Sequence, residues 1–188
     1  MPWPALIQRQ FDKVPANPSE ADFHGPYNKL LYVTFPHEFT VVPQYLPGSR
    51  GAADFFVMFE VMFEDRVVFI LEVKPKTCNR RQSDQRMYRG CGRSIVFIAL
   101  NQLGILTALS CADSPLPTLY AISAMGTKIC IYTKPRDGRL APRHIPSDSE
   151  ELLDVAPKER WNYDILEEDG IEKFKAIVEE IKQGCATL

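Results

Sequence analysis

The sequence predicts an α/β (α+β) protein in which a central mixed sheet of about five strands is flanked by helices. The first observation is a pair of short runs rich in Val, Ile and Phe, at 55–63 and 67–73, which flank the polar break 64–66. Such runs are typical of a β-hairpin. The second is the segment 167–183, whose apolar residues recur at helical spacing. Strands and amphipathic helices in one chain favour a sheet covered by helices.

The composition indicates one ordinary globular domain. A length of 188 residues, 45% hydrophobic and 24% charged, is sufficient for a sizeable core. The net charge of −2 gives no global sign of a nucleic-acid or membrane partner. The five cysteines show no C-x-x-C spacing, which argues against zinc or a disulfide framework. No signal peptide is apparent, so we expect an intracellular protein, cytoplasmic or nuclear.

The N-terminal part predicts an extended arm over 1–18, which holds four of the fifteen prolines, followed by a single domain over 19–188. Ser19 is expected to cap a short helical turn. A second helix is expected over 26–34, where a proline takes the first position. The remaining strand-like runs predict strands at 39–45, 119–124 and 128–133. Pro43 in the first of them indicates an edge strand.

The later part of the chain predicts a polar helix over 79–89 and an uncharged run of nineteen residues over 94–112. By length this run meets the criterion for a membrane span. Polar residues and Gly104 lie in its middle, and Trp or Tyr anchors are absent. A core helix, or a strand followed by a helix, is therefore favoured over membrane insertion. Gly184 is expected to end the last helix.

Three charged residues at the ends of the apolar hairpin form the main chemical signal. Alternation puts Asp54 on the face of Glu60, and Glu72 on the face of Lys74. Antiparallel pairing is expected to bring Asp54 close to Glu72. Buried carboxylates are costly unless they pair or bind an ion, and they suit Mg²⁺ or Mn²⁺, with the backbone carbonyl of Val73 as a further ligand. A strand-end ion pair without catalysis is the structural alternative.

This pattern resembles the PD-(D/E)xK nuclease superfamily, also called restriction-endonuclease-like. Asp54, then seventeen residues, then Glu72-Val73-Lys74 follows the family order of an acid on one strand and acid-x-Lys on the next. The resemblance implies the core αβββαβ and a Mg²⁺-dependent endonuclease or exonuclease. Asp54 and Glu72 would then hold the metal and Lys74 would assist the attacking water. Glu180-Ile181-Lys182 also matches acid-x-Lys, but it lies on the expected last helix.

Further residues have supporting roles in this family. An acid on the preceding helix often assists, and Glu20 is the nearest candidate. Some members carry Gln and Tyr four residues apart on the following helix. This chain has Gln82, Gln85 and Tyr88, and the last two are only three apart. The stretches DFHGPYNKLL, FILEVKP, PLPTLYAISAMGT and RWNYDILEE also resemble a group of uncharacterised fungal proteins, which adds no known activity.

A basic stretch follows the acidic residues and suggests nucleic acid as the partner. Residues 74–93 hold seven bases against the single acid Asp84. The arginines expected to contact phosphates are Arg80, Arg81, Arg86, Arg89 and Arg93. A solvated helix face is the plain alternative for this stretch. A catalytically inactive nuclease fold that binds nucleic acid or protein is the alternative function, and no pattern indicates a small-molecule cofactor.

Overall fold

The computed structural model describes residues 2–47, 55–74, 114–139, 141–142 and 161–188. The expected helix over 79–89 and the uncharged run 94–112 lie outside the described residues. Within them, the helices are α1 (Ala5–Phe11), α2 (His24–Thr34) and α4 (Glu168–Cys185), with a 3₁₀ turn η1 (Ala21–Phe23) before α2. The strands are β1 (Phe39–Pro47), β2 (Phe55–Phe63), β3 (Arg66–Lys74), β4 (Thr118–Met125), β5 (Lys128–Pro135) and β6 (Tyr163–Asp164).

The strands form one mixed sheet in the order β1-β2-β3-β4-β5-β6. Neighbours pair antiparallel except β3 and β4, which are parallel. The sheet confirms the predicted α/β (α+β) class, with six strands rather than about five, because the two-residue β6 adds to one edge. β1 lies at the other edge, as Pro43 predicted, since an edge strand tolerates a residue that lacks a backbone N–H.

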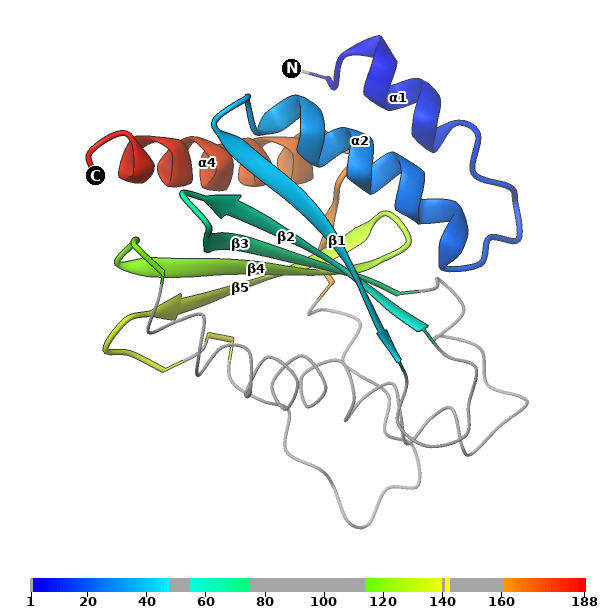
Figure 1. Ribbon diagram of the computed structural model, residues 1–188. Helices are drawn as coiled ribbons and strands as arrows, with labels where there is room; N and C mark the ends of the chain where they lie inside the picture. The colour runs from blue at the N-terminus through cyan, green and yellow to red at the C-terminus, as the bar shows by residue number, and fades with distance from the viewer. Residues whose placement is uncertain (1, 48–54, 75–113, 140, 143–160) are drawn as a thin grey trace.

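All three described helices lie on one face of the sheet (Figure 1). This face carries the apolar core, in which β3 contributes Phe69, Leu71 and Val73, each fully buried. The ring centroid of Phe69 lies 6.1 Å from that of Phe174 on α4 and 5.6 Å from that of Phe35. Burying such a side chain stabilises the fold by about 1.5–3 kcal/mol. Helix packing on this face therefore fixes which side chains of β3 point to the opposite face.

The prediction of an extended arm over 1–18 is wrong, because α1 forms there and packs into the core. Ile7 and Phe11 on α1 are buried. The indole N–H of Trp3 donates a hydrogen bond to the backbone carbonyl of Ile165, with 2.6 Å between the atoms. The prolines that suggested an arm lie outside the helix, and Pro4 takes its N-cap position. The domain therefore includes this segment and does not begin at residue 19.

Two predicted helix ends also differ from the structure. Ser19 does not cap the following turn; its backbone N–H and its hydroxyl both donate to the carboxylate of Asp22, at 2.8 Å. α4 continues through Gly184 to Cys185. A Cβ at Gly184 would lie 2.6 Å from Cδ2 of Leu116. Close packing, rather than helix termination, therefore accounts for glycine at this position.

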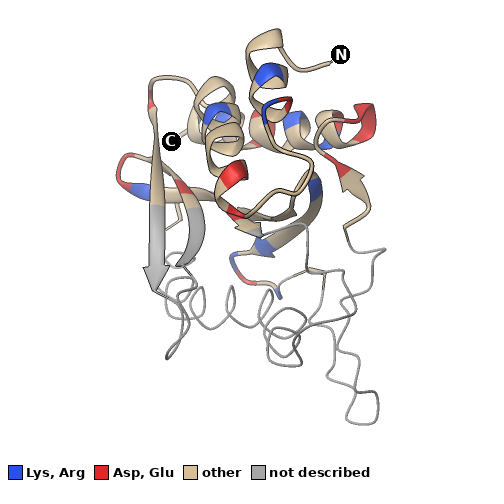
Figure 2. Ribbon diagram, turned by 90° about the vertical axis from the view of Figure 1, so that its right-hand side faces the viewer, with Lys and Arg blue, Asp and Glu red and all other residues tan. Residues whose placement is uncertain are grey.

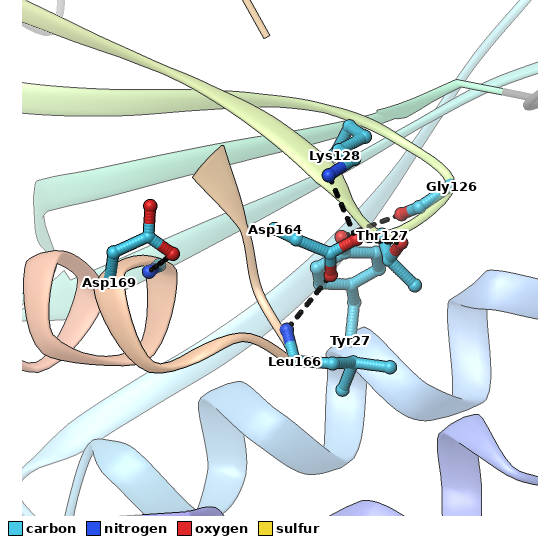
Figure 3. Close-up of polar contacts among 8 residues, drawn as sticks. Tyr27, Gly126, Thr127, Lys128, Asp164, Leu166 and Asp169 are labelled. Carbon is cyan, nitrogen blue, oxygen red and sulfur yellow. Dashed lines mark hydrogen bonds and ion pairs between the residues drawn. The ribbon is translucent and has the colours of Figure 1, made fainter. Parts of the chain in front are cut away.

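Asp164 joins the β4–β5 turn to the start of α4 (Figure 3). Its carboxylate interacts with the hydroxyl of Thr127 at 2.9 Å, the backbone N–H of Leu166 at 3.0 Å and Nζ of Lys128 at 3.4 Å. On the other side of the same turn, the hydroxyl of Tyr27 on α2 donates to the carbonyl of Gly126 at 2.7 Å. Burial, with the charge of Asp164, raises the pKa of Tyr27 well above its usual range. The tyrosine is therefore a neutral donor that holds α2 on the turn.

Gly170 in the first turn of α4 offers a test of this junction. A Cβ at this position would collide with the backbone carbonyl oxygen of Asp164. We expect Gly170→Ala to lower the free energy of unfolding by about 1–3 kcal/mol, as for other overpacked sites. Urea denaturation of the full chain measures the change. Lys173→Ala, an exposed site on the same helix, is the control and should stay within about 0.5 kcal/mol of wild type. Equal stability of the two variants would contradict the described contact.

Candidate functional site

The turn between β2 and β3 sets the register of the hairpin. Glu64 and Asp65 have positive φ angles of 47° and 59°, and Phe63 pairs with Arg66. A two-residue loop with both φ angles positive is a common connection of twisted antiparallel strands. The loop is therefore one residue shorter than the expected break over 64–66, because Arg66 already belongs to β3.

A β-bulge near this turn shifts the register once. Val61 pairs with Phe69, whereas its neighbour Met62 pairs with Val67, so Val68 is the extra residue on β3. Beyond the bulge Glu60 pairs with Ile70. Without the extra residue, Glu60 would pair with Phe69 and share the face of the helix-covered core. Bulges often re-aim side chains in this way.

The bulge leaves two glutamates on the same face of the sheet. Met58 pairs with Glu72, so Glu60 and Glu72 are diagonal neighbours on adjacent strands. Diagonal neighbours lie roughly 7–8 Å apart at Cα, which is within reach of two glutamate side chains. Glu60 is 7% exposed and Glu72 is 6% exposed. The face opposite the described helices therefore carries two buried carboxylic acids side by side.

β4 adds a buried hydroxyl beside these acids. Ser123 pairs with Glu72 in the parallel β3–β4 ladder, so the two residues share a face. Ser123 is 3% exposed, and its Oγ has no hydrogen-bond partner among the residues that the structure describes. The indole N–H of Trp161 donates to its backbone carbonyl at 3.1 Å, which leaves the side chain unaffected. Sequence inspection missed Ser123, because the register between β3 and β4 is not visible in the sequence.

This face has an apolar surround that is separate from the core beneath the helices. The buried side chains outside that core include Ile70, Leu119, Cys130, Tyr132 and Trp161. Ser123 pairs with Cys130, and Ile70 precedes Glu72 by two residues on the same strand. Low-polarity surroundings strengthen the interactions of a carboxylate with any cation. The two acids and the hydroxyl therefore form a polar group within apolar neighbours.

The structure describes only part of the predicted catalytic set. Asp54 lies outside the described residues, and the residue directly across from Glu72 is Met58. The closeness of Asp54 to Glu72 stays a prediction. Lys74 is the last residue of β3 and pairs with Met125; its side chain is outside the description. Of the three, only Glu72 has a described side chain.

Val73, the predicted backbone ligand, lies between two paired strands. It pairs with Val57 on β2 and with Ala124 on β4, and its side chain is fully buried against the helices. Ladder hydrogen bonds on both sides engage the backbone of a central strand. A metal would have to use the second lone pair of the Val73 carbonyl. That role stays a prediction. The Val73 carbonyl is less available to a metal than a carbonyl at the end of a strand, where ladder hydrogen bonds are fewer.

The supporting residues are mostly outside the described part of the chain. These are Gln82, Gln85, Tyr88 and the arginines Arg80, Arg81, Arg86, Arg89 and Arg93. On the described helices, acidic and basic residues are interspersed (Figure 2). Glu20 precedes η1, and its Oε1 lies 3.9 Å from Nε2 of His24. Its support of Glu72 stays a prediction.

Comparisons with known proteins give no relative: no family model, curated protein or solved structure matches the chain. Among the helices that the structure describes, none combines the length and apolar character that crossing a membrane requires. Across those same residues, no group of three or more His, Cys, Asp or Glu is placed to hold a metal ion.

His24, next to Glu20, gives a pH test of this end of α2. Burial lowers the pKa of His24 below its ordinary value of 6.5, and the charge of Asp22 partly opposes this. The unfolded chain therefore binds a proton at His24 more readily than the folded chain does. The free energy of unfolding is unaffected by this group above pH 6.5 and decreases as the pH drops below 6.5. We expect His24→Gln to lose less stability than wild type between pH 7.5 and 5.5 in thermal denaturation. The exposed His37 supplies the control His37→Gln, and matching pH profiles for all three proteins would refute the assignment.

Proposed function

We propose that the chain is a metal-dependent nuclease domain that hydrolyses phosphodiester bonds in nucleic acid. The observation that supports this most is the burial of Glu72 on central strand β3, diagonal to a second buried acid, Glu60. Taking carboxylates out of water costs several kcal/mol each unless cations compensate. Glu72 begins the acid-x-Lys pattern that ends at Lys74, the C-terminal residue of β3.

The donor set fits a hard divalent cation. Carboxylate and hydroxyl oxygens are ligands of Mg²⁺ and Mn²⁺, and the unpartnered hydroxyl of Ser123 adds a neutral oxygen beside Glu72. When bound, Mg²⁺ supplies Lewis-acid stabilisation of the phosphate charge and a more acidic water. In the proposal Glu72 holds the cation, and the ammonium of Lys74 orients the water and offsets negative charge that develops on the phosphate.

The order of the described elements also supports the proposal. α2, β1, β2 and β3 follow one another, and β4 then joins β3 in parallel. This agrees with the expected order αβββαβ at five of six positions. Parallel strands need a long crossover connection, usually a helix. The helix expected over 79–89 falls in that connection, which lies outside the described residues.

A second candidate function is a binding module that keeps this fold without catalysis. The observation that favours it is Met58, which occupies the position directly across from Glu72 where the hairpin was expected to supply an acid. Such a module would bind nucleic acid or an acidic protein through its basic residues. Its binding would persist in EDTA and weaken as salt rises.

A plasmid-nicking assay with Mg²⁺ tests the proposed function. We expect Glu72→Gln to reduce nicking by about 100-fold or more, because loss of a metal-bound carboxylate removes transition-state stabilisation. We expect Lys74→Met to reduce it by about 10²–10⁴-fold, the usual contribution of a proton-transfer or water-orienting group.

Glu180→Gln provides a matched control for this assay. Glu180 also begins an acid-x-Lys pattern, but it lies on the exposed face of α4, where it accepts a hydrogen bond from Tyr120. This variant should nick DNA as wild type does. Nicking by Glu72→Gln at the wild-type rate would exclude the mechanism. Salt-sensitive DNA binding in EDTA with no Mg²⁺-dependent nicking would favour the binding module instead.

A further inference from the structure

We propose that Glu60 is a second carboxylate ligand of the divalent cation held by Glu72, and that the hydroxyl of Ser123 is a third oxygen ligand. The inference rests on the proposed function, which needs a cation at Glu72. It goes further by assigning ligands on β2 and β4. The three residues come from adjacent strands and share the sheet face opposite the described helices.

The hairpin register is the first argument. The bulge at Val68 places Glu60 opposite Ile70, two positions from Glu72 on the same face. Glu60 lies in the middle of an apolar strand and is 7% exposed, and such low-polarity surroundings strengthen the attraction between a carboxylate and a cation. A bulge that turns this side chain away from the apolar core and toward Glu72 gives both acids access to one cation.

The second argument is independent of the acids. Ser123 is buried, and within the described part of the chain its Oγ finds no hydrogen-bond partner. Leaving a buried hydroxyl unsatisfied costs about 1–3 kcal/mol. Its neighbours in the ladder are Glu72 on β3 and Cys130 on β5. A buried, unpartnered hydroxyl beside two carboxylates is explained if it coordinates the same metal ion as they do.

The chemistry of the three groups selects the ion. Two carboxylates and one hydroxyl provide three hard oxygens and two negative charges, which neutralise a divalent cation. Mg²⁺ and Mn²⁺ accept few protein ligands and keep several waters, so the remaining positions are left for water and phosphate oxygens. Cys130 lies on the same face, and Ser123 stands between it and Glu72 in the ladder.

Calorimetric titration of the full chain with Mn²⁺ tests the ligand set. We expect wild type to bind, and Glu60→Gln and Glu72→Gln each to weaken the Mn²⁺ affinity by at least about tenfold, with a smaller loss for Ser123→Ala. Glu64→Gln changes an exposed acid in the β2–β3 turn and should leave binding unchanged. Thermal denaturation without metal checks that each variant is folded.

Glu60→Met covers the case in which Glu60→Gln fails to fold. Methionine keeps a volume similar to that of glutamate and removes both carboxylate oxygens, so a folded Glu60→Met variant should bind Mn²⁺ more weakly than wild type. Wild-type affinity in a folded Glu60 variant, with binding lost in Glu72→Gln, would overturn the assignment of Glu60 and leave the proposed function intact. Absence of Mn²⁺ binding by the wild-type chain near millimolar concentration would overturn both.

Discussion

Side chains along β3 point alternately into two different environments, and the arrangement of the molecule depends on that alternation. Phe69, Leu71 and Val73 enter the apolar core beneath α1, α2 and α4. Ile70 and Glu72 therefore point to the opposite face. Because helix packing fixes the first set, the second set has no freedom to exchange faces without exposing the core. The position of Glu72 follows from the hydrophobic packing of its neighbours on the strand.

The bulge extends this constraint to β2. A single extra residue, Val68, brings Glu60 onto the face of Glu72 while Phe59 and Val61 remain in the core. The parallel pairing of β4 then places Ser123 beside Glu72. Three strands thus bring polar oxygens together within an otherwise apolar layer. Buried polar groups of this kind favour a functional interpretation, since apolar residues would stabilise the sheet at lower cost.

The sequence predicted the parts of the fold that follow from local periodicity: the two hairpins, α2, α4 and the edge position of β1. It missed α1, because the prolines around that segment suggested an arm, although they occupy positions that a helix tolerates. For the site, Glu72 was predicted, but the closeness of Glu60 and Ser123 to it was not. The shared face of Glu60 and Glu72 depends on a bulge, and the position of Ser123 depends on a parallel register between distant segments. Neither leaves a pattern in the sequence.

The most direct measurement is the anomalous diffraction from crystals of the chain grown with Mn²⁺. The account predicts a peak between the carboxylates of Glu60 and Glu72, with the Ser123 hydroxyl oxygen beside it at about 2–2.3 Å from the ion, as for a hard-oxygen ligand. A protein cation bridging the two carboxylates, with no metal peak on this face of the sheet, would contradict it.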